Sequence, residues 1–262
     1  MAELVERYVG ELYKKFGRFA PWLPDTPIAL GAVGVIEGGE FVRKTSLASL
    51  GVAWKASAPG PTTVIDYASA SGVTITLKAK GEVVPGSSLA QAEAGARISF
   101  AKLGGVVLQA AGVRVTTLNE PDRVARAILE LFARGIWEPG WVFVDEVRTA
   151  ASTTILISEE KATKLELKSA LNLQGPAALS GGLVLAAKQG SITSFLGSKG
   201  FTPLFKLSCV KKQWLDSILS GKPKGKITGA KRAQPAAAQV PNIPRGEALL
   251  DPVAFRPRSR KS

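Results

Sequence analysis

The clearest pattern in the chain is an alternation of hydrophobic and polar residues between positions 73 and 80. Hydrophobic side chains occupy every second position there, and threonine and lysine fill the others. Successive side chains of a strand lie on opposite faces, so this segment predicts one buried face and one solvated, basic face. With 62–67 we expect it to form a hairpin. Alternation or short apolar runs between turn residues predict further strands within 28–57, 97–115, 141–144, 154–168, 183–195 and 201–211.

One helix is strongly indicated in the middle of the chain. Asn119 can cap it, Pro121 suits its first turn and Gly135 would end it. Val124, Ile128, Leu131 and Phe132 would lie on one face. Since short turns join most strands, we expect a twisted antiparallel β-meander packed on this central helix.

A second amphipathic helix is predicted for residues 2–22. Its apolar stripe includes Phe16 and Phe19, and Lys14, Lys15 and Arg18 make its end basic. One interpretation is a helix that binds a membrane surface or a partner through these five residues. The other is a helix docked on the sheet.

The composition changes after residue 220. Residues 221–262 hold 10 of the 34 Lys and Arg but 2 of the 21 Asp and Glu, a net charge of +8 out of +13. We predict a single domain over 1–220 and a Pro/Ala-rich tail, disordered or docked, over 221–262. An apolar island at 249–255 could dock on the domain, but removing the tail should cost little stability. The residues that we expect to bind an anionic partner are Lys222, Lys224, Lys226, Lys231, Arg232, Arg256, Arg258, Arg260 and Lys261.

Histidine is absent and there is one cysteine, Cys209, which the alternation places on the hydrophobic side of its strand. These counts remove histidine-based triads and the common zinc sites, so we predict no catalytic residues, no metal and no cofactor. A carboxylate- or lysine-dependent enzyme is the remaining enzymatic alternative, and we predict no small-molecule substrate.

The sequence therefore predicts a non-enzymatic α+β binding or assembly protein that self-associates. Its tail would engage an anionic membrane, a nucleic acid or an acidic protein, or would serve only as a solvated tail. With acidic residues at the N-terminus and no long apolar run, we expect a cytoplasmic protein, peripheral at the membrane.

An antiparallel sheet, a basic N-terminal helix and a short detachable C-terminal segment together are similar to the plan of bacterial gasdermin-like pore-forming proteins. That resemblance implies an effector held inactive by its C-terminal segment. Those proteins tend to carry a lipidated cysteine near the N-terminus, which this chain lacks, and we transfer no residue roles from them.

Overall fold

The computed structural model describes residues 2–22, 28–70, 72–76, 83–84, 96–169, 178–179, 183–197, 201–219 and 248–257. They form an α+β fold with antiparallel strand pairing and an N-terminal helix, as predicted. The elements in chain order are α1 (Ala2–Phe16), β1 (Ala32–Glu37), β2 (Glu40–Ser46), β3 (Thr63–Ala68), β4 (Val73–Thr76), β5 (Val83–Val84), β6 (Arg97–Phe100), β7 (Val106–Thr117), α2 (Pro121–Ala133), β8 (Val142–Ala150), β9 (Ser152–Ser158), β10 (Thr163–Ser169), β11 (Ala178–Leu179), β12 (Leu183–Gln189), β13 (Ile192–Gly197), β14 (Phe201–Val210), α3 (Lys212–Leu219) and β15 (Leu250–Pro252).

The strands make two sheets. The larger sheet has the order β13-β9-β7-β8-β1-β2, and β3 also pairs with β7, β14 with β8 and β15 with β14. The smaller sheet has the order β11-β12-β10-β6-β4-β5. This is not the predicted meander, because β7 lies between β9 and β8. The predicted hairpin of 62–67 with 73–80 is also wrong: β3 pairs with β7, whereas β4 pairs with β6 and β5.

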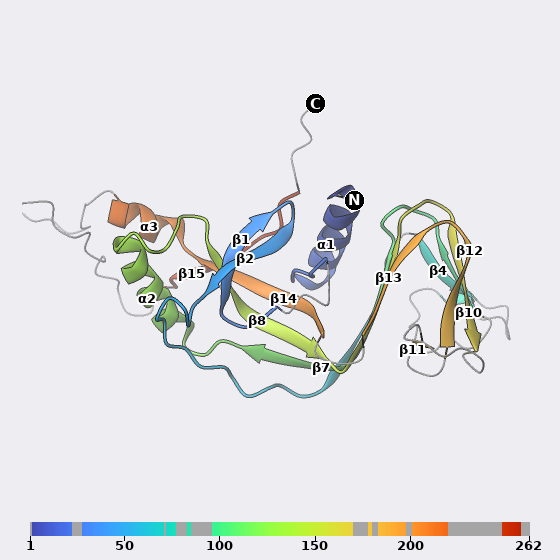
Figure 1. Cartoon of the computed structure of the whole chain (residues 1–262), viewed down its shortest axis with the longest axis horizontal. Coiled ribbons are helices and arrows are strands. Elements are labelled where there is room, and N and C mark those ends of the chain that lie inside the picture. The colour runs from blue at the N-terminus through green and yellow to red at the C-terminus, as the bar shows by residue number, and fades with distance from the viewer. Residues whose placement is uncertain are drawn as a thin grey trace, which may run out of the picture.

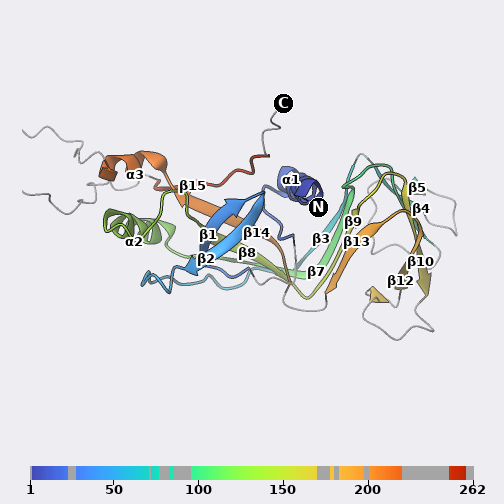
Figure 2. The ribbon, with the colours of Figure 1, turned by 45° about the horizontal axis from the view of Figure 1, so that its top comes forward.

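Four strands of the larger sheet continue into four strands of the smaller one. The order β13-β9-β7-β3 in the first matches β12-β10-β6-β4 in the second, and each matching pair is consecutive in the chain. Figures 1 and 2 show these strands turning together from one sheet into the other. We call this line the crease; within the described residues it consists of 69–70, 72, 101–105, 159–162 and 190–191. The chain thus contains two bent hairpins. In the first, β3-β4 is one arm and β6-β7 the other; in the second, β9-β10 is one arm and β12-β13 the other. Both hairpins bend at the crease.

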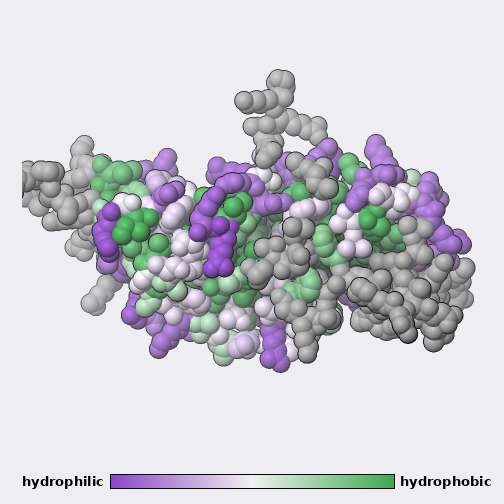
Figure 3. Space-filling model, in the orientation of Figure 1, coloured by the Kyte–Doolittle hydropathy of each residue, from purple (hydrophilic) through white to green (hydrophobic). Residues whose placement is uncertain are grey.

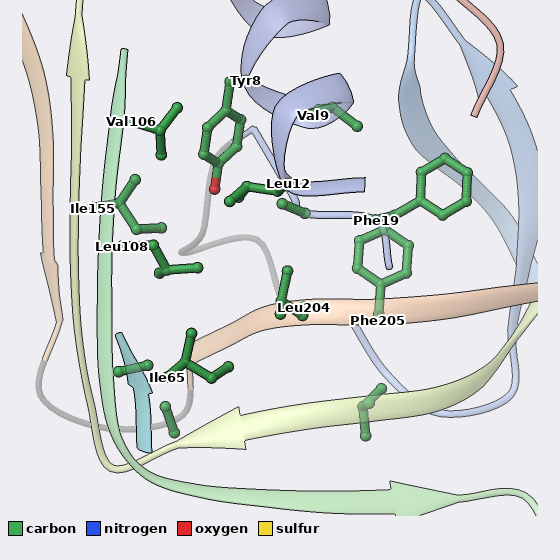
Figure 4. Close-up of a cluster of buried hydrophobic side chains, with 14 of the residues drawn as sticks. Tyr8, Val9, Leu12, Phe19, Ile65, Val106, Leu108, Ile155, Leu204 and Phe205 are labelled. Carbon is green, nitrogen blue, oxygen red and sulfur yellow. The ribbon is translucent and has the colours of Figure 1, made fainter. Parts of the chain in front are cut away.

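Helix α1 covers one face of the larger sheet beside the crease. Tyr8, Val9 and Leu12 are fully buried, and Figure 4 shows Tyr8 beside residues of β7 and β9, including Leu108 and Ile155. The stripe read from the sequence is thus the buried face of a docked helix.

The smaller sheet packs on the opposite face at the crease. Val107 and Leu156 alternate with the residues under α1 and join a separate cluster with Ile98, Phe100 and Leu165 of the smaller sheet. Both faces of the larger sheet are therefore covered near the crease, one by α1 and one by the folded-over hairpin ends.

Helix α2 lies at one end of the larger sheet beside α3 (Figure 1). Its buried residues form a cluster of their own, which includes Leu47, Trp137 and Phe143. Asn119 does not cap α2; its side-chain amide donates to Ala56 O, and Glu120 precedes the helix in a left-handed conformation. Gly135 ends it as predicted, with φ +70°.

Candidate functional site

The C-terminal segment, residues 248–257, docks as an added strand along β14. Strand β15 pairs antiparallel with Ser208–Val210. Lys211 N donates to Leu249 O at 2.9 Å and Val253 N donates to Leu207 O at 3.0 Å. Strand addition of this kind satisfies the backbone of an extended peptide while its side chains enter pockets on the host.

Side chains of this segment enter both large hydrophobic clusters. Leu249 is fully buried in the cluster around α2. Val253 and Phe255 pack against the cluster around α1. That the tail adds little to stability stays a prediction; this packing opposes it, because undocking would expose parts of both clusters to water.

Phe255 contacts α1 at a position where a side chain is missing. A Cβ atom at Gly10 would lie 2.9 Å from the Phe255 ring, and one at Gly39, in the β1–β2 turn, would lie 3.2 Å from it. The ring centroid lies 6.1 Å from that of Tyr13 and 6.4 Å from that of Phe19. These two glycines therefore create the space that the C-terminal aromatic ring fills.

The same helix binds the segment on one side and strand β3 on the other. Tyr13 donates through its hydroxyl to Val253 O at 3.1 Å. Tyr67 of β3 donates to the Glu11 carboxylate at 2.6 Å, and its ring lies 5.9 Å from Lys15 Nζ. Burial and this carboxylate neighbour both raise the pKa of Tyr67, so it remains a hydroxyl donor. Helix α1 thus lies between the C-terminal segment and an edge strand that enters the crease.

An ion-pair cluster anchors the chain after α1. Arg18 donates two hydrogen bonds to Glu146 at 2.8 and 2.9 Å, and Arg148 Nε donates to the same carboxylate at 3.1 Å. Burial alone would raise the pKa of Glu146, but the two guanidinium groups outweigh it and hold that pKa below its usual value. Phe19 forms a backbone bridge with Phe205 next to this cluster.

These contacts decide which residues of the predicted membrane or partner helix stay available. Lys14 and Lys15 are exposed. Arg18 is held by Glu146, Phe19 is 1% exposed and Phe16 packs edge-on against Tyr67, with ring centroids 5.5 Å apart. Of that set the two lysines are exposed in this conformation, Phe16 and Arg18 are partly buried, and Phe19 is buried.

Of the predicted anion-binding tail, the structure describes Arg256, which is exposed. The other eight residues lie outside the described ranges.

The smaller sheet is amphipathic across its strands. Ile98 faces Leu165 and Ile75 on its two neighbours, and these three side chains are buried. On the other face Arg97 faces Glu166, and Lys188 pairs with Glu166 at 2.9 Å. Of the lysines that alternation places on this polar face, 78 and 80 lie outside the described residues. One face of the smaller sheet is thus apolar and the other charged, whereas in the larger sheet β9 is buried on both faces from Thr153 to Ser158.

Exposed hydrophobic surface is sparse. On the face shown in Figure 3, hydrophobic residues form separate areas with hydrophilic residues between them. Within the described residues, the large hydrophobic side chains classed as exposed are Val64 (64%), Leu219 (70%) and Ile136 (37%). The apolar faces of α1 and of the hairpins are therefore covered in this conformation.

Other candidate sites offer less. A cavity of about 100 Å³ at the start of α2 is lined by Trp54, Lys55 and Arg123, but Arg123 already pairs with Glu120. No group of three potential metal ligands occurs within the described residues. Cys209 is half-buried, and burial raises the pKa of its thiol, which disfavours a thiolate nucleophile.

No helix within the described ranges is both long enough and apolar enough to cross a membrane. Comparison with known families finds no family model that matches the chain, and no curated protein sequence matches it.

Proposed function

We propose that the chain is a non-enzymatic, pore-forming effector with a gasdermin-like plan, held inactive by its docked C-terminal segment. The observation that carries this proposal is the crease: two hairpins bend at one level, in matching strand order, and form two sheets instead of one long one. Straightened, the same strands would make two long hairpins.

The length of a straightened hairpin suits a membrane. Strands that cross a bilayer need about 9–11 residues at a tilt of about 45°. Residues 152–169 of β9 and β10 exceed that length. In β10 the buried Leu165 and Leu167 alternate with the charged Lys164 and Glu166, which is the alternation that a wall between lipid and water requires.

The edges of the hairpin sheet suit assembly with further copies. Within the described residues, β3 pairs with β7 alone and β13 with β9 alone. Because each neighbouring pair in β13-β9-β7-β3 is antiparallel, the two edges run in opposite directions. The β3 edge of one copy could therefore extend the sheet at the β13 edge of the next with antiparallel pairing.

The C-terminal segment supplies the inactive state in this proposal. It packs on α1, and α1 covers the face of β3, β7 and β9 beside the crease. Cleavage between the domain and the segment would convert an intramolecular contact into a bimolecular one, which favours release. Arg232 and Arg245 are trypsin-type cleavage positions in the sequence between them.

Limited trypsin digestion beside vesicles tests this proposal. The vesicles contain phosphatidylcholine with phosphatidylglycerol and a trapped self-quenching dye. We expect dye release and a ladder of oligomers after removal of the C-terminal segment, and neither from the intact chain. Clean removal of the segment without dye release or oligomers would rule out the pore.

The second candidate is a binding protein whose basic tail engages a polyanion. The net charge of +8 on residues 221–262 favours it. A nucleic-acid shift assay at several salt concentrations distinguishes it, since polyanion binding releases counterions and weakens steeply with salt. The two functions are compatible if the same tail attracts the intact chain to an anionic membrane.

A further inference from the structure

Three buried hydroxyl groups lie at or beside the crease. Ser158 and Thr163, on either side of the β9–β10 turn, are fully buried, and Ser69, after β3, is 4% exposed. Val106 N donates to Ser69 Oγ at 2.9 Å. Ser158 Oγ donates to Glu160 O, while Thr163 Oγ1 lies 3.1 Å from the same carbonyl and 3.4 Å from Ser191 O. Hydroxyls thus supply additional hydrogen bonds to backbone groups where the strands bend.

Backbone bonds join neighbouring strands along the same line. Gly104 N donates to Ser158 O at 2.7 Å, Ser158 N to Gly105 O at 3.0 Å, and Glu159 N to Ser191 O at 3.1 Å. The Glu159 carboxylate accepts hydrogen bonds from the Ser191 and Thr193 hydroxyls. The turns of both hairpins are therefore linked to one another.

The bend also contains strain. Ala162 has φ +60°, a left-handed conformation that disfavours a residue with a Cβ atom. A Cβ atom at Gly190 would lie 2.7 Å from Thr163 Oγ1. In a straight strand Ala162 would have an ordinary extended conformation, so this strain favours straightening and the hydroxyl contacts oppose it.

We propose that Ser158, Thr163 and Ser191, with the Glu159 carboxylate and Glu160 carbonyl that they bind, form a lock that favours the bent over the straightened hairpins. The inference rests on the proposed pore function and deepens it. The hydroxyls matter only in the bent state, because a neighbouring strand can satisfy the same carbonyls once the strands are straight. A group that stabilises one of two conformations shifts the equilibrium by that difference.

Two substitutions act on the lock in opposite directions. Thr163→Val keeps the shape of the side chain but removes the hydroxyl, and loss of a buried hydrogen bond should favour opening about tenfold. Ala162→Gly removes the left-handed strain at an exposed position and should make opening rarer by a few-fold. Thr153→Val is the matched control: Thr153, on β9, is also buried, but its hydroxyl has no hydrogen-bond partner among the described residues.

Hydrogen exchange of the full-length chain measures opening directly. The amides of Gly104, Ser158 and Glu159 should exchange about tenfold faster in Thr163→Val, more slowly in Ala162→Gly and unchanged in Thr153→Val. Amides of α2 should not respond in any variant. Equal effects of Thr163→Val and Thr153→Val, or no effect of Ala162→Gly, would overturn the lock. If Thr163→Val fails to fold, Ala162→Gly alone decides the question.

Dye release after trypsin treatment separates the lock from the pore. Faster release by Thr163→Val and slower release by Ala162→Gly support both. Release at one common rate in all variants refutes the lock and leaves the pore standing. Altered hydrogen exchange at the crease, with no dye release from any variant, supports the lock and refutes the pore.

Discussion

Replacing Phe255 by alanine should loosen the C-terminal segment without touching the rest of the fold. The ring fills the space above Gly10 and Gly39 and packs against Tyr13 and Phe19. It is the outermost apolar residue of the docked segment that the structure describes. The backbone hydrogen bonds that dock the segment come from its other residues, so the β15–β14 ladder can still form in the variant.

The expected magnitude follows from burial and ring packing. Full burial of a Phe side chain contributes about 1.5–3 kcal/mol, and half of that applies to a half-buried ring. Its aromatic contacts add about 0.5–1 kcal/mol beyond burial. Docking should therefore weaken by about 2 kcal/mol, or about 30-fold in the docking equilibrium.

Hydrogen exchange at Lys211 and Val253 measures the change, because both amides donate across the docked strand. Both should exchange about 30-fold faster in Phe255→Ala, if they exchange by local undocking. The control is Leu219→Ala on α3, which removes an apolar side chain that is 70% exposed and should leave both rates unchanged. Exchange at Val253 that is the same in Phe255→Ala as in wild type would refute the docking energetics derived from these contacts.

Three further predictions concern α1, the ion-pair cluster and the tail. Tyr67→Phe removes the donor to the Glu11 carboxylate and should lower the free energy of unfolding by about 1.5 kcal/mol in urea, with an unchanged m-value; a shift below 0.5 kcal/mol would contradict a charge-assisted bond. Glu146 has a lowered pKa in the folded chain, so its stabilising contribution is present above the unfolded pKa of about 4.3 and lost as pH falls through the folded value. Glu146→Gln should be less stable than wild type at pH 7 and should lose less stability on acidification, and equal pH dependence of the two melting temperatures would oppose this. Neutralising the four basic residues within 256–261 should reduce the salt dependence of binding to anionic vesicles or nucleic acid, and an unchanged slope would exclude electrostatic attraction through them.

Local patterns predicted the elements better than their partners. The helix at 121–133 and its end at Gly135 follow from apolar spacing and a residue that tolerates positive φ. The strand at 73–76 follows from alternation. Alternation does not encode the pairing partner. Nearness in sequence suggested a hairpin with 62–67, whereas β3 and β4 lie in different sheets.

Contacts between distant segments lay beyond the sequence patterns. Nothing local to Gly10 indicates that it receives a ring from position 255, because the two are separated by almost the whole chain. Tyr67 and Glu11 were missed for the same reason. Arg18 belongs to a basic helix end, which suggested that it faces a membrane or a partner. Its actual partner, Glu146, is on a strand that alternation alone could not place beside it.

The crease left a faint signal that could have been recognised. Small or hydroxyl-bearing residues occur at 104–105, 158, 163 and 190–191, where two segments of strand-like sequence meet. From the sequence alone, these positions indicate ordinary turns between strands. A turn that reverses the chain and a bend that redirects it use the same residues, and only the strand register distinguishes them.

The opposed directions of the β3 and β13 edges have a kinetic consequence for any assembly through them. Each added copy would use one edge and present a fresh edge of the other kind, so growth would continue by the same step until the ring closes. A copy with one defective edge could still join a growing arc but would stop it there. Substoichiometric amounts of a variant with proline in β3 should therefore suppress assembly of the wild-type chain, as a terminator does in polymerisation.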